Sequence, residues 1–274
     1  MLRGQLRVDV MAELNMELCK AIAVQHGLPL QFVIKEFYVF DVLEQITAIT
    51  VISKRLAFKG GTALSKVYLG KLQRFSEDLD FDSNTESIAE TMRLCKQIAE
   101  KLTGYEIKEF RRVRGTIQFY CMYEGPSGMA DHVRVDMSAK KILSAKPLAI
   151  KPAISAVTQR SVTGFSVYAI EDLAAQKLGA LGRRYEGKDF YDVHAALPLC
   201  GALGSAITKM LMAEKIDTNA SAFLKQVIQQ IKKADYKKLR NLTNPYIPVP
   251  NRPRSWQQLK NDLILKLELL QEKI

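Results

Sequence analysis

The fold of this chain is decided by FKGGTALS at residues 58–65 and by RFSEDLDFD at residues 74–82. A glycine pair and a hydroxyl residue after an apolar run present backbone N–H groups, which bind phosphate oxygens. The Asp-x-Asp that follows supplies hard carboxylate oxygens, the ligands that Mg²⁺ and Mn²⁺ prefer. The two stretches therefore predict a site for a nucleoside triphosphate and a divalent metal. The residues expected to contact the nucleotide here are Lys59, Gly60, Gly61, Thr62 and Ser76.

The Asp-x-Asp is interpreted as part of a β-strand. Residues two apart in a strand project from the same face, so Asp78 and Asp80 point one way. Leu79 and Phe81 are then buried on the other face. Two carboxylates side by side repel each other unless a cation lies between them, which favours a metal site. A solvated acidic strand end or turn is the alternative interpretation.

The order of these residues, GGT, a spacer and then R-x-S-x-D-x-D, resembles the AbiEii/AbiGii nucleotidyltransferases of abortive-infection systems and the MenT toxins. Those proteins belong to the DNA polymerase β-like nucleotidyltransferase superfamily. The resemblance implies a third acidic metal ligand from a later strand. Asp136 fits this role, because residues 133–137 alternate between apolar and polar side chains as a half-buried strand does. The expected metal ligands are Asp78, Asp80 and Asp136.

The spacer before the Asp-x-Asp is long enough for a helix at residues 63–69. That helix starts at the glycine pair, so its positive N-terminal end is expected to face the triphosphate. Arg74 and Ser76 lie just before the carboxylates, where a guanidinium and a hydroxyl can reach phosphate oxygens. A surface arginine and a turn serine are the alternatives.

A second block, EDLAAQKLGALGRR at residues 171–184, is predicted to be a helix, because its acidic start and basic end agree with the helix dipole. Lys177 borders the apolar face of this helix, where a lysine either reaches water or points into a cleft. By resemblance, Lys177 contacts the nucleotide phosphates, and KDFYDV at residues 188–193 supplies an acidic pair, Asp189 and Asp192. An N-cap role is the alternative for Asp189. Asp192 is expected either to position Lys177 or to accept the proton of an attacking hydroxyl.

The resemblance implies transfer of a nucleoside monophosphate from a nucleoside triphosphate to an acceptor, with pyrophosphate leaving. The acceptor expected first is RNA, at the 3′ end of tRNA, which would make the protein a toxin of a bacterial toxin–antitoxin or phage-defence system with a cognate antitoxin. A protein hydroxyl, on a partner or on the chain itself, is the alternative acceptor. A non-catalytic nucleotide- or nucleic-acid-binding module is the third possibility. The catalytic residues are expected to be Asp78, Asp80, Lys177 and Asp192.

The charge of the chain points to a polyanionic partner. Its 40 Lys and Arg against 29 Asp and Glu give a net charge of +11, which attracts nucleic acid in a salt-dependent way. Two basic clusters are candidate RNA contacts: Lys232, Lys233, Lys237, Lys238 and Arg240, and separately Arg111, Arg112 and Arg114. The alternatives are a solvated helix face for the first cluster and a charge-protected edge strand for the second.

Other features exclude several classes of protein. No apolar run is long enough to cross a bilayer, and the N-terminus lacks the apolar core of a signal peptide, so a cytoplasmic location is expected. The four cysteines form no C-x-x-C pair, which argues against a disulfide framework or a zinc site. The three histidines do not cluster and are interpreted as structural.

The predicted fold class is α/β (α+β), a polymerase β-like mixed-sheet core with a helical N-terminal segment and a helical C-terminal domain. The core is expected at residues 1–150 and the helical domain, which completes the nucleotide site, at residues 151–274. Strands are predicted near residues 56–59, 78–81, 105–112, 116–123 and 132–137. Helices are predicted up to residue 52, at 87–102 and at 255–271, where Ser255 caps the last one. The proline-rich residues 244–253 are expected to be an extended connector.

Overall fold

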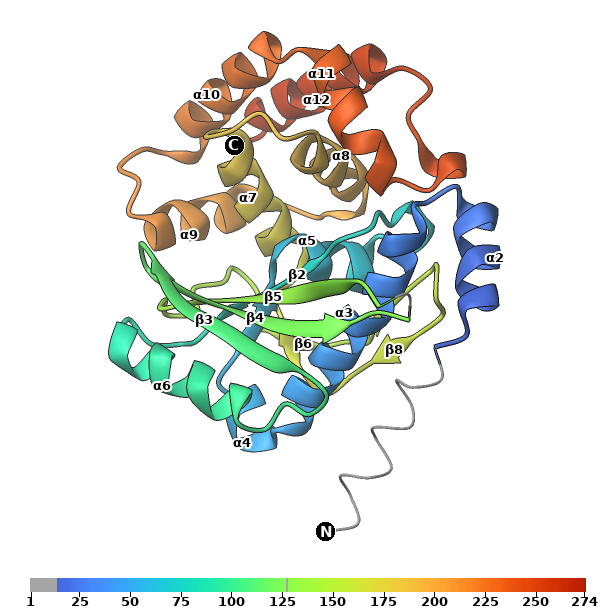
Figure 1. Ribbon diagram of the computed structural model, residues 1–274. Coiled ribbons are helices and arrows are strands. Elements are labelled where there is room, and N and C mark those ends of the chain that lie inside the picture. Colours follow the sequence, from blue (N-terminus) through green and yellow to red (C-terminus); the bar gives the residue numbers. More distant parts are fainter. Residues whose placement is uncertain (1–13, 127) are drawn as a thin grey trace.

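The computed structural model of the protein describes residues 14–126 and 128–274. A mixed sheet with its covering helices forms one part, which we call the sheet lobe (residues 14–126 and 128–169), and helices alone form the other, the helical lobe (residues 170–274; Figure 1). The predicted fold class is therefore confirmed.

The main sheet has seven strands in the order β3-β4-β5-β2-β1-β9-β6. β2 is the central strand of this sheet. It pairs with β1 in the antiparallel direction and with β5 in the parallel direction. The strands run as follows: β1 (Ala57–Lys59), β2 (Asp78–Asp82), β3 (Glu106–Val113), β4 (Thr116–Glu124), β5 (Ala130–Ser138), β6 (Ala149–Ile150) and β9 (Ser166–Val167). A separate hairpin joins β7 (Ala153–Ile154) to β8 (Ser161–Val162). All five strands predicted from the sequence are present.

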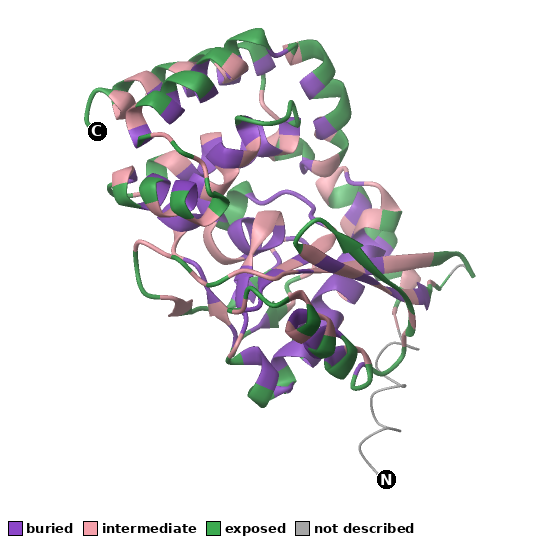
Figure 2. Cartoon of the chain, turned by 90° about the vertical axis from the view of Figure 1, so that its left-hand side faces the viewer, coloured by how far each residue is buried: buried purple, intermediate pink, exposed green. Residues whose placement is uncertain are grey.

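One face of the sheet is covered by helices. α3 (Leu30–Ala48) packs on β5, and α6 (Ile88–Ala99) packs mainly on β4. The alternation predicted for β5 is observed, because Val133 and Val135 are fully buried while Arg134 is half-buried on the opposite face. The edge strand β3 is almost wholly exposed (Figure 2).

The N-terminal helices follow the sequence prediction. α2 (Met16–His26), α3 and the short α4 (Thr50–Ser53) precede the first strand. Asn15 caps α2 by accepting bonds from two backbone N–H groups, and Gly27 ends the helix in the left-handed region at φ 59°. The first 13 residues lie outside the described part of the chain.

The helical lobe contains α7 (Ile170–Leu181), α8 (Gly187–Ala196), α9 (Gly204–Glu214), α10 (Ala220–Lys233), α11 (Tyr236–Thr243) and α12 (Trp256–Gln271). Ser255 caps α12 as predicted, with its hydroxyl accepting from the Gln258 N–H at 3.2 Å. The prediction that residues 244–253 form an extended connector is wrong in detail. The segment contains two 3₁₀ turns, each with a proline near its start, because proline is compatible with the first turn of a helix.

The change from sheet to helices comes later in the chain than residue 150, the boundary expected from the sequence. β9 pairs with β1 in the main sheet, and α7 begins only at Ile170. Strands this short carry no clear hydrophobic period, so the sequence did not mark them. Within the described residues, no helix has both the length and the apolar character needed to span a bilayer.

A buried ion pair joins three segments of the sheet lobe. Lys66 Nζ lies 2.7 Å from Glu36 Oε1, and neither side chain is more than 1% exposed. Ser155 donates a hydrogen bond to the same carboxylate. Glu36 comes from α3 and Lys66 from the turn after α5, so the pair holds the glycine turn against the core.

We expect Lys66→Met to lower the free energy of unfolding by about 3 kcal/mol, because it leaves the Glu36 carboxylate buried without a positive partner. Urea denaturation of the metal-free protein measures this loss. Lys20→Met is the control, since the Lys20–Glu17 pair is exposed and contributes little. Equal midpoints for the two variants would contradict the prediction.

Candidate active site

The glycine turn forms the floor of the site. β1 ends at Lys59 and the helical turn α5 (Gly60–Ala63) follows at once, continued by a π-helical turn at Leu64–Tyr68. The helix predicted at residues 63–69 thus starts at the glycine pair, as expected. Its π geometry was not predicted, and such turns are often found at functional sites.

Gly60 is required by both its backbone and its surroundings. Its φ of 76° is in the left-handed region, which L side chains rarely adopt. A Cβ atom at this position would lie 2.0 Å from Asp80 Oδ2. The glycine therefore lets the backbone approach the carboxylate of Asp80 closely.

The three predicted metal ligands lie on neighbouring strands. β2 and β5 are parallel, and their register places Asp80 opposite Asp136 and Asp78 opposite Arg134. Arg134 lies between two of the carboxylates, with Nη2 2.6 Å from Asp78 Oδ2 and Nε 3.3 Å from Asp136 Oδ1. In the part of the chain that the structure describes, no three acidic, His or Cys side chains already form a metal-binding group.

The electrostatics of these carboxylates fit a site for a divalent cation. Burial raises the pKa of both Asp78 and Asp80 to about 6. Burial also raises the pKa of Asp136, and the charge of Asp136 adds to the increase at Asp80. Asp136 Oδ1 is buried and has no hydrogen-bond donor among the residues that the structure describes. Carboxylate oxygens that nearby cations do not fully neutralise, and that have a free lone pair, are suited to bind Mg²⁺ or Mn²⁺.

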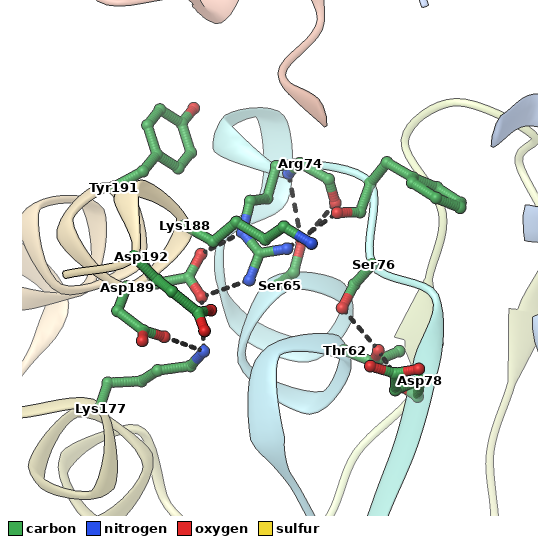
Figure 3. A network of polar contacts seen from close by, with 12 residues as sticks. Thr62, Ser65, Arg74, Ser76, Asp78, Lys177, Lys188, Asp189, Tyr191 and Asp192 are labelled. Atoms are coloured by element: carbon green, nitrogen blue, oxygen red, sulfur yellow. Dashed lines mark hydrogen bonds and ion pairs between the residues drawn. The ribbon is translucent and has the colours of Figure 1, made fainter. Parts of the chain in front are cut away.

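Lys177 is held by two carboxylates of α8. Its Nζ lies 2.8 Å from Asp189 Oδ1 and 3.0 Å from Asp192 Oδ2. Asp192 in turn accepts two hydrogen bonds from Arg74, at 2.8 Å from Nε and 2.7 Å from Nη2. Figure 3 shows this chain of contacts, which links the helical lobe to the segment before β2.

The N-cap interpretation of Asp189 is wrong. α8 begins at Gly187, Glu186 occupies the cap position, and Asp189 is fully buried inside the first turn. Burial opposes its ionisation, but Lys177 and Arg184 outweigh this and lower its pKa to about 2. Asp189 thus stays ionised and orients Lys177.

Asp192 is fully buried between Arg74 and Lys177. Of the two roles that the sequence left open, this geometry fits the positioning of Lys177. Both oxygens are already engaged by cations, so neither is free to accept a proton from a substrate.

Arg74 and Ser76 both have protein partners near the glycine turn. Both are buried, so Arg74 is not a surface residue, and its guanidinium is bound to Asp192. The Ser76 hydroxyl accepts a bond from Thr62 Oγ1 at 2.8 Å. A Cβ at Gly61 would lie 2.8 Å from Arg74 Nη2, 3.3 Å from Ser76 Oγ and 3.4 Å from Lys177 Nζ. These polar groups therefore meet where Gly61 leaves space.

A cavity of about 220 Å³ opens between the two lobes at the glycine turn. Its lining includes five residues expected from the sequence motifs, Lys59, Gly60, Gly61, Asp80 and Lys177. It also includes four basic residues that sequence reasoning did not assign to the site, Lys140, Lys141, Arg183 and Arg184. Arg183 and Arg184 form the basic end of the predicted helix. A basic helix end also agrees with the helix dipole, so this pattern alone does not indicate a role in the site.

The two basic clusters expected to contact RNA lie in different places. The cluster of α10 and α11 is at the end of the helical lobe away from the sheet (Figure 1), and Lys232 is paired with Glu268 at 2.9 Å. Arg111 and Arg112 are on the exposed edge strand β3, and Arg114 is in the turn to β4. None of these residues lines the cavity.

The sheet, the glycine turn and the paired carboxylates define the protein as a nucleotidyltransferase. The sequence profile of the family described as "Nucleotidyl transferase AbiEii toxin, Type IV TA system" matches residues 41–269. The chain therefore belongs to the AbiEii family and is a toxin nucleotidyltransferase of a type IV toxin–antitoxin system. Membership implies a cognate antitoxin, and enzymes of this kind generally use a nucleoside triphosphate and a divalent metal.

Solved structures share the fold. MenT4, the nucleotidyltransferase toxin Rv2826c from Mycobacterium tuberculosis H37Rv, matches with a TM-score of 0.64 and 16% identity over 94% of this chain and 89% of that chain. JHP933 from Helicobacter pylori matches with a TM-score of 0.55 and 16% identity over 90% of this chain and 94% of its own. No curated protein matches the chain in sequence.

We expect Asp80→Asn to raise the stability of the metal-free protein above pH 6 by about 1–2 kcal/mol. The pKa of Asp80 is about 6 in the folded chain and lower when unfolded, so the folded state holds its proton more tightly. Wild-type stability is therefore lost as pH rises from about 4 to about 6, and asparagine removes this loss. Urea denaturation in EDTA from pH 5 to pH 8 measures the effect.

The control is Asp217→Asn, which changes an exposed carboxylate. Its stability relative to wild type should be the same at every pH. A gain in Asp80→Asn that does not grow between pH 5 and pH 7 would refute the electrostatic explanation.

Proposed function

We propose that the protein transfers a nucleoside monophosphate from a nucleoside triphosphate to an RNA acceptor, most specifically the 3′ end of tRNA. The observation that supports this most directly is the pairing of Asp80 with Asp136 across parallel strands, beside Gly60. Asp80 lines the cavity, and carboxylates on adjacent strands beside basic side chains suit phosphoryl transfer, which depends on positioning and on neutralising charge.

Asp78, Asp80 and Asp136 are the residues that would hold Mg²⁺ or Mn²⁺. When bound, a divalent cation supplies charge neutralisation at the reacting phosphate and lowers the pKa of the attacking hydroxyl. The chain's own contribution is to keep these three carboxylates in register on β2 and β5.

The triphosphate would be held by the glycine turn and by Lys177. The first N–H groups of a helical turn have no intrahelical acceptor, so those of Gly61 and Thr62 are available to phosphate oxygens. The Thr62 hydroxyl is already bonded within the protein, which leaves its backbone as the contact. Lys177 Nζ lies near Gly61 and is kept charged by Asp189 and Asp192.

The RNA acceptor is supported by charge. The chain carries a net charge of +11, and Lys140, Lys141, Arg183 and Arg184 line the cavity. The β3–β4 hairpin belongs to the same sheet as the carboxylates, since β4 pairs with β5 along Thr116–Glu124. A strand of RNA that enters the cavity along this sheet would meet the arginines of the hairpin.

Transfer is tested with α-labelled ATP, CTP, GTP and UTP in turn, each with total tRNA and Mg²⁺ or Mn²⁺. Label should appear in RNA with the wild type, and Asp80→Asn and Lys177→Met should each lose at least about 100-fold in rate, because each removes charge stabilisation from the reacting phosphates. Lys20→Met, far from the cavity and exposed, should remain active.

The same reactions separate the alternatives. Label in ribonuclease-resistant protein bands would favour a protein hydroxyl as the acceptor. Wild-type protein that binds the triphosphates but transfers no label to RNA or protein would contradict the proposed reaction.

Binding of tRNA should depend more on the β3–β4 hairpin than on α10 and α11. We expect the triple variant Arg111→Gln, Arg112→Gln, Arg114→Gln to bind tRNA more weakly and to reduce the slope of log affinity against log salt by about 2, because each phosphate contact contributes about 0.7–0.9. The matched triple variant Lys233→Gln, Lys237→Gln, Lys238→Gln removes the same charge elsewhere.

Filter binding at several salt concentrations measures both slopes. The second triple variant should retain most of the wild-type slope, because its residues lie at the far end of the helical lobe (Figure 1). Equal losses in the two variants would show that net charge, and not the hairpin, determines binding.

A further inference from the structure

We propose that Arg134 is a built-in counterion of the carboxylate cluster and competes with the divalent cation for Asp78 and Asp136. In this proposal Arg134 is a positioning residue, which sets how tightly the site binds metal. The inference rests on the proposed function, because it assumes that these carboxylates are the metal ligands.

The position of Arg134 follows from the register of two strands. It precedes Asp136 by two residues on β5, so both side chains project from the same face. The pairing of β2 with β5 places Arg134 directly opposite Asp78. The guanidinium therefore lies on the same face as the carboxylates, where it contacts Asp78 and Asp136 on adjacent strands.

The contacts of Arg134 neutralise the carboxylates unequally. Its Nη2 donates a hydrogen bond to Asp78 Oδ2 at 2.6 Å. Its Nε is 3.3 Å from Asp136 Oδ1, close enough for an ion pair, yet within residues 14–126 and 128–274 neither atom has a hydrogen-bond partner. The other oxygen of Asp136 accepts a hydrogen bond from Gln118 Nε2 at 3.2 Å.

This arrangement suits exchange with a metal ion. A spherical cation needs no particular donor angle, so it can use the Asp136 oxygen that the planar guanidinium leaves without a hydrogen bond. An oxygen of Asp78 that is bound tightly to Arg134 is less available to a metal. The two cations therefore compete, and binding of the metal requires the guanidinium to move.

The surroundings of Arg134 allow that movement. Its side chain is 35% exposed, compared with 14% for Asp136 and 3% for Arg74, the arginine that is fixed inside the protein by Asp192. Arg74 is enclosed and makes two good hydrogen bonds to one carboxylate, whereas Arg134 is at the surface of the cluster. Of these two arginines near the site, Arg134 is the one that can leave.

The competition has one consequence for the metal-free protein and one for metal binding. Arg134 reduces the repulsion between Asp78 and Asp136, so its removal should lower the melting temperature in EDTA. The same removal eliminates a positive charge that opposes the metal, so the divalent cation should bind more tightly and stabilise the variant more than the wild type.

The test is a calorimetric titration of Mn²⁺ into the wild-type protein and into Arg134→Met, both without nucleotide. Thermal melts of both proteins are recorded in EDTA and in Mn²⁺. We expect Arg134→Met to bind Mn²⁺ roughly 5- to 10-fold more tightly. It should also melt lower in EDTA and show a larger Mn²⁺-induced rise in melting temperature. Arg93→Met, which changes an exposed arginine of α6, should match the wild type in all three respects.

Unchanged or weaker Mn²⁺ binding by Arg134→Met would overturn the inference and make Arg134 a support for the ligands. Arg134→Gln, which keeps a polar side chain, is the second variant if the methionine protein does not fold. Asp80→Asn should abolish Mn²⁺ binding in either background, which assigns the measured ion to this cluster.

Nucleotide transfer by the wild type, measured in parallel, separates the two proposals. If the wild type transfers label and Arg134→Met gains no affinity for Mn²⁺, only the role of Arg134 fails. If the wild type neither binds Mn²⁺ nor transfers label, the proposed function itself fails.

Discussion

The site depends on the repulsion between three carboxylates that two parallel strands bring together. The register of β2 and β5 sets Asp80 beside Asp136, and burial raises the pKa of each. Such a cluster is costly for a folded protein unless positive charge is supplied. Arg134 supplies part of it from within the chain. The arrangement of these carboxylates therefore works against stability.

A second electrostatic arrangement joins the two lobes. Arg74 precedes β2 in the sheet lobe, and Asp192 belongs to α8 in the helical lobe; their side chains are buried against each other. Lys177 is part of the same network through Asp189 and Asp192 (Figure 3). Removing one partner of a buried ion pair strongly destabilises a folded protein. The network therefore holds the two lobes and Lys177 in one arrangement.

The protein combines a common catalytic fold with a surface suited to a charged substrate. AbiEii toxins and the structure of MenT4 share this architecture, although MenT4 has only 16% identity to the chain. What the two structures share at that distance is the fold. The basic residues around the cavity lie in the loop after β5 and just after α7: Lys140, Lys141, Arg183 and Arg184.

The sequence by itself determined the elements of the site, because each follows from a local rule. The period of two identified β2 and β5, and the glycine pair predicted the helical turn α5. Only the tertiary structure decided which side chains of the site contact one another. Arg74 with Asp192 and Arg134 with Asp78 are pairs of residues far apart in sequence. The contact of Asp189 with Lys177 joins two separate helices, α8 and α7. Such contacts depend on strand register and on how the lobes pack, and neither leaves a mark in a local pattern of residues.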